Sequence, residues 1–134
     1  MFEAHNPPTV MPLVGPLSWG LEARNPRRVL YVSGQVGTYP DGRVADGVIE
    51  QAKLAWVNVG AILSSAGMGP RNIVRTGIYF TENVAWSEEL RQEFNRGRIA
   101  FLGDHRPAST LLFVKGLMDP QWLVEIDAIA MDPA

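Results

Sequence analysis

The chain has 134 residues, 46% of them apolar and 19% charged, so it fits one folded domain and excludes the disordered and fibrous classes. It contains no cysteine and only two histidines, which excludes disulfides, thiolate nucleophiles, cysteine-bound metals and a histidine-rich metal centre. Twelve Lys and Arg against fourteen Asp and Glu give a net charge of -2, which weighs against a nucleic-acid partner. We therefore expect one domain over 1–134 that works without a metal or other cofactor.

The start of the chain gives no sign of export or membrane insertion. Glu3 and His5 interrupt it, and no apolar run approaches the roughly 20 residues of a membrane span. We therefore expect a cytoplasmic protein with no membrane partner. Four prolines fall within 1–16, and each removes a hydrogen-bond donor, so this segment is predicted to be a proline-rich N-terminal arm rather than a regular element.

The next segments read as strands and turns. A strand is predicted over 18–25, and a β-branched and aromatic run over 29–32 predicts a buried strand that ends at Ser33-Gly34. Turn dipeptides fill 35–46, where at most a short strand fits.

Helical spacing of apolar residues begins at 48 and predicts a helix over 48–66, stopped by Gly67. A strand over 71–80 would complete a βαβ unit. A second amphipathic helix is predicted over 84–102, and two further strands over 108–114 and 122–131.

The order β-β-(β)-α-β-α-β-β predicts an α+β fold in which two helices cover one face of a mixed sheet. The other face then needs a cover, and copies of the same chain supply one most simply. We therefore expect an oligomer.

Two carboxylates mark the last strand. A period of two places Glu125 and Asp127 on one face, about 6 to 7 Å apart, with Val124 and Ile126 on the other. Either this face of the strand is exposed to solvent, or one carboxyl has a raised pKa and serves as a general acid or base.

Two further segments carry polar groups that suit a ligand. Ser33-Gly34-Gln35 ends a buried strand, and Arg106 follows His105 in the turn between a helix and a strand. Each fits ordinary turn chemistry as well as ligand binding, and an arginine could hold a carboxylate.

Taken together, these motifs resemble those of the Rid (YjgF-type) family of reactive-intermediate deaminases, from Gly15-Pro16 to Ala130. The most specific segments are Tyr31-Val32-Ser33-Gly34-Gln35-Val36, Gln51-Ala52, Asn58-Val59-Gly60-Ala61-Ile62-Leu63, Ala66-Gly67-Met68, Asn72-Ile73-Val74, Arg106-Pro107-Ala108-Ser109 and Val124-Glu125-Ile126-Asp127-Ala128-Ile129-Ala130. The resemblance implies a chorismate-mutase-like subunit that forms a homotrimer, with its sheets as an inner barrel and small-molecule clefts between the subunits.

The resemblance also implies site residues. Family members hydrolyse enamines and imines, and an arginine just after the Pro-Ala pair binds the substrate carboxylate; Ser109 stands there in this chain, and Leu17 replaces the usual tyrosine after Gly-Pro. Ser33, Gly34, Asn95 and Glu125 match the family pattern. The resemblance therefore implies Glu125 as the catalytic residue, with Ser33, Gly34, Asn95, Ser109, Leu17 and, as a conjectured replacement for the arginine, Arg106 as substrate-binding residues.

Three functions remain open. The first is a trimeric hydrolase of a small enamine or imine, with a specificity altered by Ser109. The second is a trimer that binds a small metabolite without catalysis, which the loss of two pocket side chains favours. The third is an endoribonuclease, against which the acidic charge balance weighs.

Overall fold

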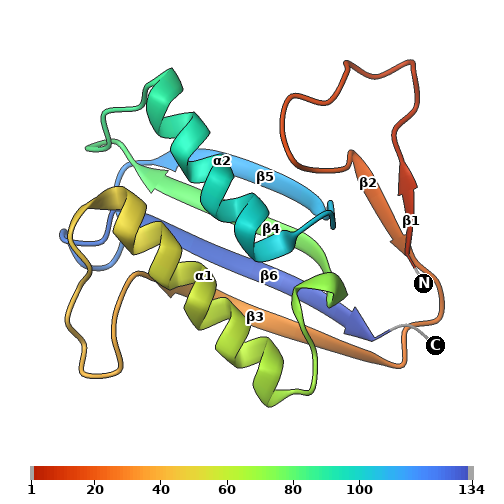
Figure 1. The fold of residues 1–134 in the computed structure, drawn as a ribbon, viewed down its shortest axis with the longest axis horizontal. Helices are drawn as coiled ribbons and strands as arrows, with labels where there is room; N and C mark the ends of the chain where they lie inside the picture. Colours follow the sequence, from red (N-terminus) through yellow and green to blue (C-terminus); the bar gives the residue numbers. More distant parts are fainter. Residues whose placement is uncertain (1, 133–134) are drawn as a thin grey trace.

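The computed structural model describes residues 2–132; Met1, Pro133 and Ala134 of the domain expected over 1–134 lie outside the described residues. The main sheet has the strand order β3-β6-β4-β5. Its strands are β3 (Arg28–Val36), β4 (Ile73–Thr81), β5 (Ala108–Val114) and β6 (Val124–Asp132), and the helices are α1 (Gly47–Ser65) and α2 (Glu88–Leu102). Both helices lie on the same face of this sheet (Figure 1), which confirms the predicted α+β class.

The sheet is mixed. β4 and β5 are parallel neighbours connected through α2, whereas β6 pairs antiparallel with β3 on one side and with β4 on the other. β3 and β4 are therefore parallel to each other, as a βαβ unit requires, but β6 lies between them. The last strand in the sequence thus occupies an inner position of the sheet.

The first helix ends as its sequence predicts. Gly67 has a φ of 70°, and the amides of Gly67 and Met68 donate to the carbonyls of Ser64 and Leu63. This is a Schellman motif, which satisfies carbonyls that the helix end leaves without a partner. Met68 and Leu63 are both buried in the core, so the helix end is also fixed by apolar contact.

The second helix begins later than predicted. The apolar spacing places its start at 84, but Ser87 has an extended backbone and its hydroxyl accepts a hydrogen bond from the amide of Leu90, so α2 begins at Glu88. A serine N-cap determines a helix start more strongly than the apolar period does, because it satisfies a backbone donor.

The N-terminal arm is the main error of the sequence prediction. Phe2–His5 forms strand β1, which pairs antiparallel with β2 (Gly20–Ala23) beside the main sheet (Figure 1). Proline prevents strand pairing only where it occurs, and the first proline of the arm is Pro7. Strand β3 continues past the predicted end at Ser33-Gly34 to Val36. No strand element forms over 37–46, where an isolated bridge between Thr38 and Val44 closes the turn.

Alternation along β6 gives the sheet two different faces. Val124, Ile126 and Ala128 are buried under the helices, whereas Glu125 and Asp127 point to the uncovered side, as predicted. Strand pairing extends this uncovered side, which we call the open face, across the sheet: Val29, Tyr31, Arg75, Gly77, Tyr79, Thr110, Leu112, Glu125, Asp127 and Ile129. None of the helices in the described part of the chain has the length and apolar character needed to cross a bilayer.

Candidate functional site

A cavity of about 240 Å³ lies between α2, β5 and the loop before β2; we call it the α2–β5 cavity. It brings together three of the predicted site residues, Leu17, Asn95 and Ser109. The side chains and backbone that line it are those of Val14, Gly15, Leu17, Trp86, Arg91, Asn95, Arg98, Ser109, Leu111 and Phe113. Its walls are therefore mainly apolar, with a few polar groups among them, as is usual for small-molecule sites.

Ser109 contributes a hydroxyl that is held in place. It pairs with Thr76 across β5 and β4, and the fully buried Thr76 Oγ1 lies 2.9 Å from Ser109 Oγ. When Thr76 donates this hydrogen bond, Ser109 keeps its own proton for a ligand in the cavity.

Arg98 is the residue that the sequence prediction missed. Its side chain is only 4% exposed, it lines the α2–β5 cavity, and its buried Nε has no hydrogen-bond partner. Burial, and then the nearby charge of Arg106, lower the pKa of Arg98 to about 10, so it stays charged at neutral pH. The signal was present in the sequence: Arg98 lies four residues from both Phe94 and Leu102, on the buried side of α2.

Glu125 lies on the open face of β6, next to a bulge in β3. The register shifts between Val32 and Gln35, so that Ser33 and Gly34 form the irregular part of the strand. A Cβ on Gly34 would lie 2.4 Å from Glu125 Oε2, so the backbone there is packed against the carboxylate. Glu125, Ser33 and Gly34 thus form one group, which we call the carboxylate patch.

The environment of Glu125 suits a proton acceptor. Burial first, and the neighbouring Asp127 second, raise its pKa above the ordinary value of 4.5. Asp127 itself accepts a hydrogen bond of 2.9 Å from the Tyr79 hydroxyl, whose pKa is raised by that contact. A half-buried carboxylate with a raised pKa can take a proton from water at neutral pH.

The carboxylate patch and the α2–β5 cavity lie on different faces of the sheet. Glu125 pairs with Tyr79, and Tyr79 with Leu112, on the open face, whereas Ser109 and Leu111 alternate with Leu112 and point to the helix side. Within one chain the predicted site residues other than Arg106 therefore form two separate groups.

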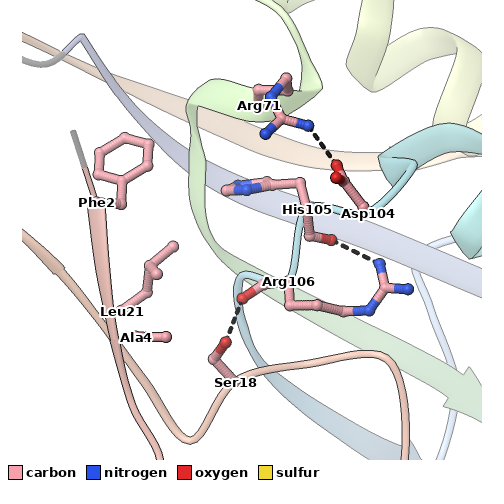
Figure 2. A pocket seen from close by; sticks show the side chains of 8 residues that line it. All are labelled: Phe2, Ala4, Ser18, Leu21, Arg71, Asp104, His105 and Arg106. Carbon is pink, nitrogen blue, oxygen red and sulfur yellow. Dashed lines mark hydrogen bonds and ion pairs between the residues drawn. The ribbon is translucent and has the colours of Figure 1, made fainter.

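Arg106 belongs to neither group. It lines a second cavity of about 290 Å³ beside the β1–β2 pair, with Phe2, Leu21 and His105 (Figure 2). Its guanidinium turns back and donates to the carbonyls of Gly103 and His105, at 2.7 and 2.9 Å. The structure therefore gives its side chain a role in closing the turn after α2.

Within residues 2–132, Glu3, His5 and Glu22 form a group that could hold a metal ion on the β1–β2 pair. The guanidinium of Arg24, however, pairs with both Glu3 and Glu22. Because the guanidinium of Arg24 already neutralises these carboxylates, we interpret the group as a surface ion-pair network.

Comparison with known proteins identifies relatives over most of the chain. The model of the family described as Endoribonuclease L-PSP matches residues 14–132. A RutC family protein from Aquifex aeolicus is 39% identical over 66% of this chain and 68% of that protein. The 2-iminobutanoate/2-iminopropanoate deaminase of Rattus norvegicus is 42% identical over 78% of this chain and 73% of its own length, whereas the match to the Mus musculus deaminase covers only 50% of that protein.

Solved structures agree with the sequence relatives. A Rid-family protein of unknown function from Yersinia pestis, YyfB, has a TM-score of 0.85 and 26% identity, over 97% of this chain and 98% of its own. E. coli TdcF, solved with bound serine, has a TM-score of 0.67 and 25% identity, over 89% of this chain and 90% of its own.

Proposed function

The chain belongs to the Rid (YjgF) family, whose model carries the description Endoribonuclease L-PSP, and from this premise we propose that it hydrolyses a small imine or enamine. The relatives named as 2-iminobutanoate/2-iminopropanoate deaminases support the reaction class. The single observation that carries the proposal in this chain is Glu125, a half-buried carboxylate with a raised pKa, packed against Gly34.

Glu125 supplies the proton transfer that imine hydrolysis needs. Its carboxylate takes a proton from water as the water oxygen bonds to the imine carbon, and passes that proton to the imine nitrogen, which gives a carbinolamine. Glu125 then takes the proton of the new hydroxyl group and delivers it to the same nitrogen, so that the C–N bond breaks and ammonia leaves as the carbonyl group forms. One water is consumed for each imine, and no redox step occurs.

The complete site needs two copies of the chain. Glu125 and the α2–β5 cavity face opposite sides of the sheet, so a substrate held in the cavity of one copy meets the carboxylate patch of another. The open face also exposes apolar side chains, among them Val29 at 41%, Tyr31 at 76% and Leu112 at 47%. These are the features of a surface covered by symmetric assembly, and we assign it to a homotrimer with the substrate clefts between subunits.

The lining of the α2–β5 cavity supports an altered specificity. Leu17 and Ser109 stand where the family resemblance places a tyrosine and an arginine, and Trp86, Leu111 and Phe113 add apolar surface. We therefore propose that its substrate is an imine whose apolar group is larger than the methyl group of 2-iminopropanoate. The bound serine in E. coli TdcF supports a small-molecule site in this fold.

A non-catalytic trimer that binds a small metabolite is the second candidate. Ser109 and Leu17 favour it, because both replacements remove polar groups from the cavity, whereas the raised pKa of Glu125 favours catalysis. The formal net charge of -2 weighs against an endoribonuclease, whose substrate is a polyanion.

The test is a coupled assay in which an amino acid oxidase generates imines from leucine, phenylalanine and alanine, and the loss of each imine is timed. Wild type is expected to accelerate hydrolysis of the two larger imines, and Glu125→Gln to abolish the acceleration. The matched control is Glu89→Gln on α2, an exposed glutamate away from both groups, which should keep full activity.

Subunit mixing tests the composite site. Glu125→Gln and Asn95→Ala each disable one of the two groups, so each homotrimer should be inactive. After joint unfolding and refolding, about a quarter of the sites combine two intact halves, and activity should return to that level. If wild type accelerates hydrolysis but mixing restores no activity, the site is not shared between subunits. If wild type accelerates hydrolysis of no imine, the proposed activity is wrong.

A further inference from the structure

Arg98 is a buried charge without a counter-ion. Its side chain is 4% exposed, and its Nε is enclosed without an acceptor. The charge that acts on it from within the chain is Arg106, which repels it. Burying an unpaired charge is costly, so a buried cation without a counter-ion indicates a site where a ligand or partner supplies the opposite charge.

The neighbouring groups do not neutralise Arg98. Arg91, which also lines the α2–β5 cavity, donates through Nε and Nη2 to the carboxylate of Glu88 at 2.9 and 2.7 Å. The carboxylate of Glu88 is therefore already engaged by Arg91. Among residues 2–132, no ion pair forms at Arg98.

The cavity offers a second donor beside this cation. Ser109, fixed by Thr76, carries a proton that can be donated into the same space. A guanidinium and a hydroxyl together suit a carboxylate, because the guanidinium fork matches its two oxygens and the hydroxyl adds a third hydrogen bond.

We propose that Arg98, with Ser109, binds the carboxylate of the substrate from α2, in place of an arginine on β5. The ligand class is a monocarboxylate with an apolar side chain, since Leu17, Trp86 and Phe113 line the rest of the cavity. The identification of this ligand as a 2-imino acid rests on the proposed function. The binding of a carboxylate by Arg98 is tested separately from turnover.

The binding test uses 4-methyl-2-oxopentanoate, the product of hydrolysing the leucine-derived imine, and its uncharged methyl ester as probes. Calorimetry on the full-length assembled protein gives Kd. Arg98→Met is expected to weaken binding of the acid by about tenfold or more and to leave binding of the ester unchanged. Arg98→Lys keeps the charge but not the guanidinium fork, so its Kd for the acid should lie between those of wild type and Arg98→Met. Arg96→Met, an exposed arginine of α2 outside the cavity, is the control and should bind the acid like wild type.

Melting temperature provides a second measurement. Without ligand, Arg98→Met should melt above wild type, because an unpaired buried charge is removed, and the acid should raise the melting temperature of wild type but not of the variant. Unchanged binding of the acid by Arg98→Met would overturn the proposal. Dissociation of the assembly in this variant would also overturn it, because Arg98 would then pair with a carboxylate of another copy.

The two proposals fail in different ways. If wild type binds the acid through Arg98 but hydrolyses no imine, the proposed activity is wrong and the carboxylate site stands. If imines are hydrolysed, and Arg98→Met neither raises KM nor weakens binding of the acid, the proposed activity stands and the proposed carboxylate site is wrong.

Discussion

The backbone of Gly34 lies against the carboxylate of Glu125, and a Cβ at position 34 would stand 2.4 Å from Oε2 and 2.5 Å from Cδ. Real Cβ atoms do not approach heavy atoms so closely. The contact therefore makes position 34 sensitive to any side chain, although its backbone conformation does not require glycine. A side chain at position 34 would therefore require the carboxylate of Glu125 to move.

Gly34→Ala should reduce activity much more than stability. The atoms in the way belong to the flexible end of the Glu125 side chain, which can rotate away, so the chain still folds but the carboxylate is displaced. We expect kcat/KM for imine hydrolysis to fall by about 10- to 100-fold. Gly116→Ala, where an added Cβ meets nothing within 4 Å, is the control. Full activity in Gly34→Ala would show that the contact does not position Glu125.

Asp127 should control the pH at which Glu125 works. The charge of Asp127 is the second cause of the raised Glu125 pKa, after burial. If Glu125 accepts a proton from water, kcat/KM rises with pH as Glu125 loses its proton, with an apparent pKa above 4.5. Asp127→Asn removes the like charge, so the rising limb should move to lower pH. A limb that stays in place or moves to higher pH would contradict this account.

The open face should carry the assembly. Leu112 is 47% exposed there, so Leu112→Asp places a charge on a surface that the trimer would bury. We expect light scattering coupled to gel filtration to show a shift from trimer to monomer. Val57→Asp, at a residue that is 62% exposed on α1, should leave the mass unchanged. If Leu112→Asp remains a trimer, the interface does not lie on the open face.

Gln51 should matter for stability rather than for chemistry. Its buried amide donates to the carbonyls of Ala45 and Gln121, each at 3.1 Å, and accepts from the amide of Leu123 at 2.8 Å. Gln51→Ala leaves all three backbone groups without this partner, and we expect a loss of about 2 to 4 kcal/mol in the free energy of unfolding, measured in urea. The exposed Gln92→Ala on α2 should change it by less than about 0.5 kcal/mol. Equal effects of the two variants would contradict the role of Gln51.

The elements that the sequence predicts well are those with a regular period. Alternation along 122–131 places Glu125 and Asp127 on one face, and the structure agrees because β6 is buried on its other side. The start of α2 is predicted at 84 because the apolar period includes Trp86, but the N-cap hydrogen bond of Ser87 starts the helix four residues later, at Glu88. Strand β1 is missed because the prolines that follow it dominate the composition of the segment.

The candidate site shows where sequence reasoning stops. Resemblance to a family can transfer only residues that the family has, so it identifies the loss of the arginine at Ser109 but not the buried Arg98. Whether a cation on the buried side of a helix has a partner depends on which loops and strands pack against it, which no local pattern contains. The separation of Glu125 from Ser109 likewise follows from the pairing of three strands.

The inner position of β6 has a consequence for how the protein folds. β3 and β4 never pair with each other, and the strand that joins them is the last element in the sequence. During synthesis β4, α2 and β5 can assemble as soon as they emerge, but β3 has no sheet partner until β6 arrives from about 90 residues downstream. Until then, β3 is an unpaired strand edge exposed to other chains, and so the segment where association between nascent chains would begin.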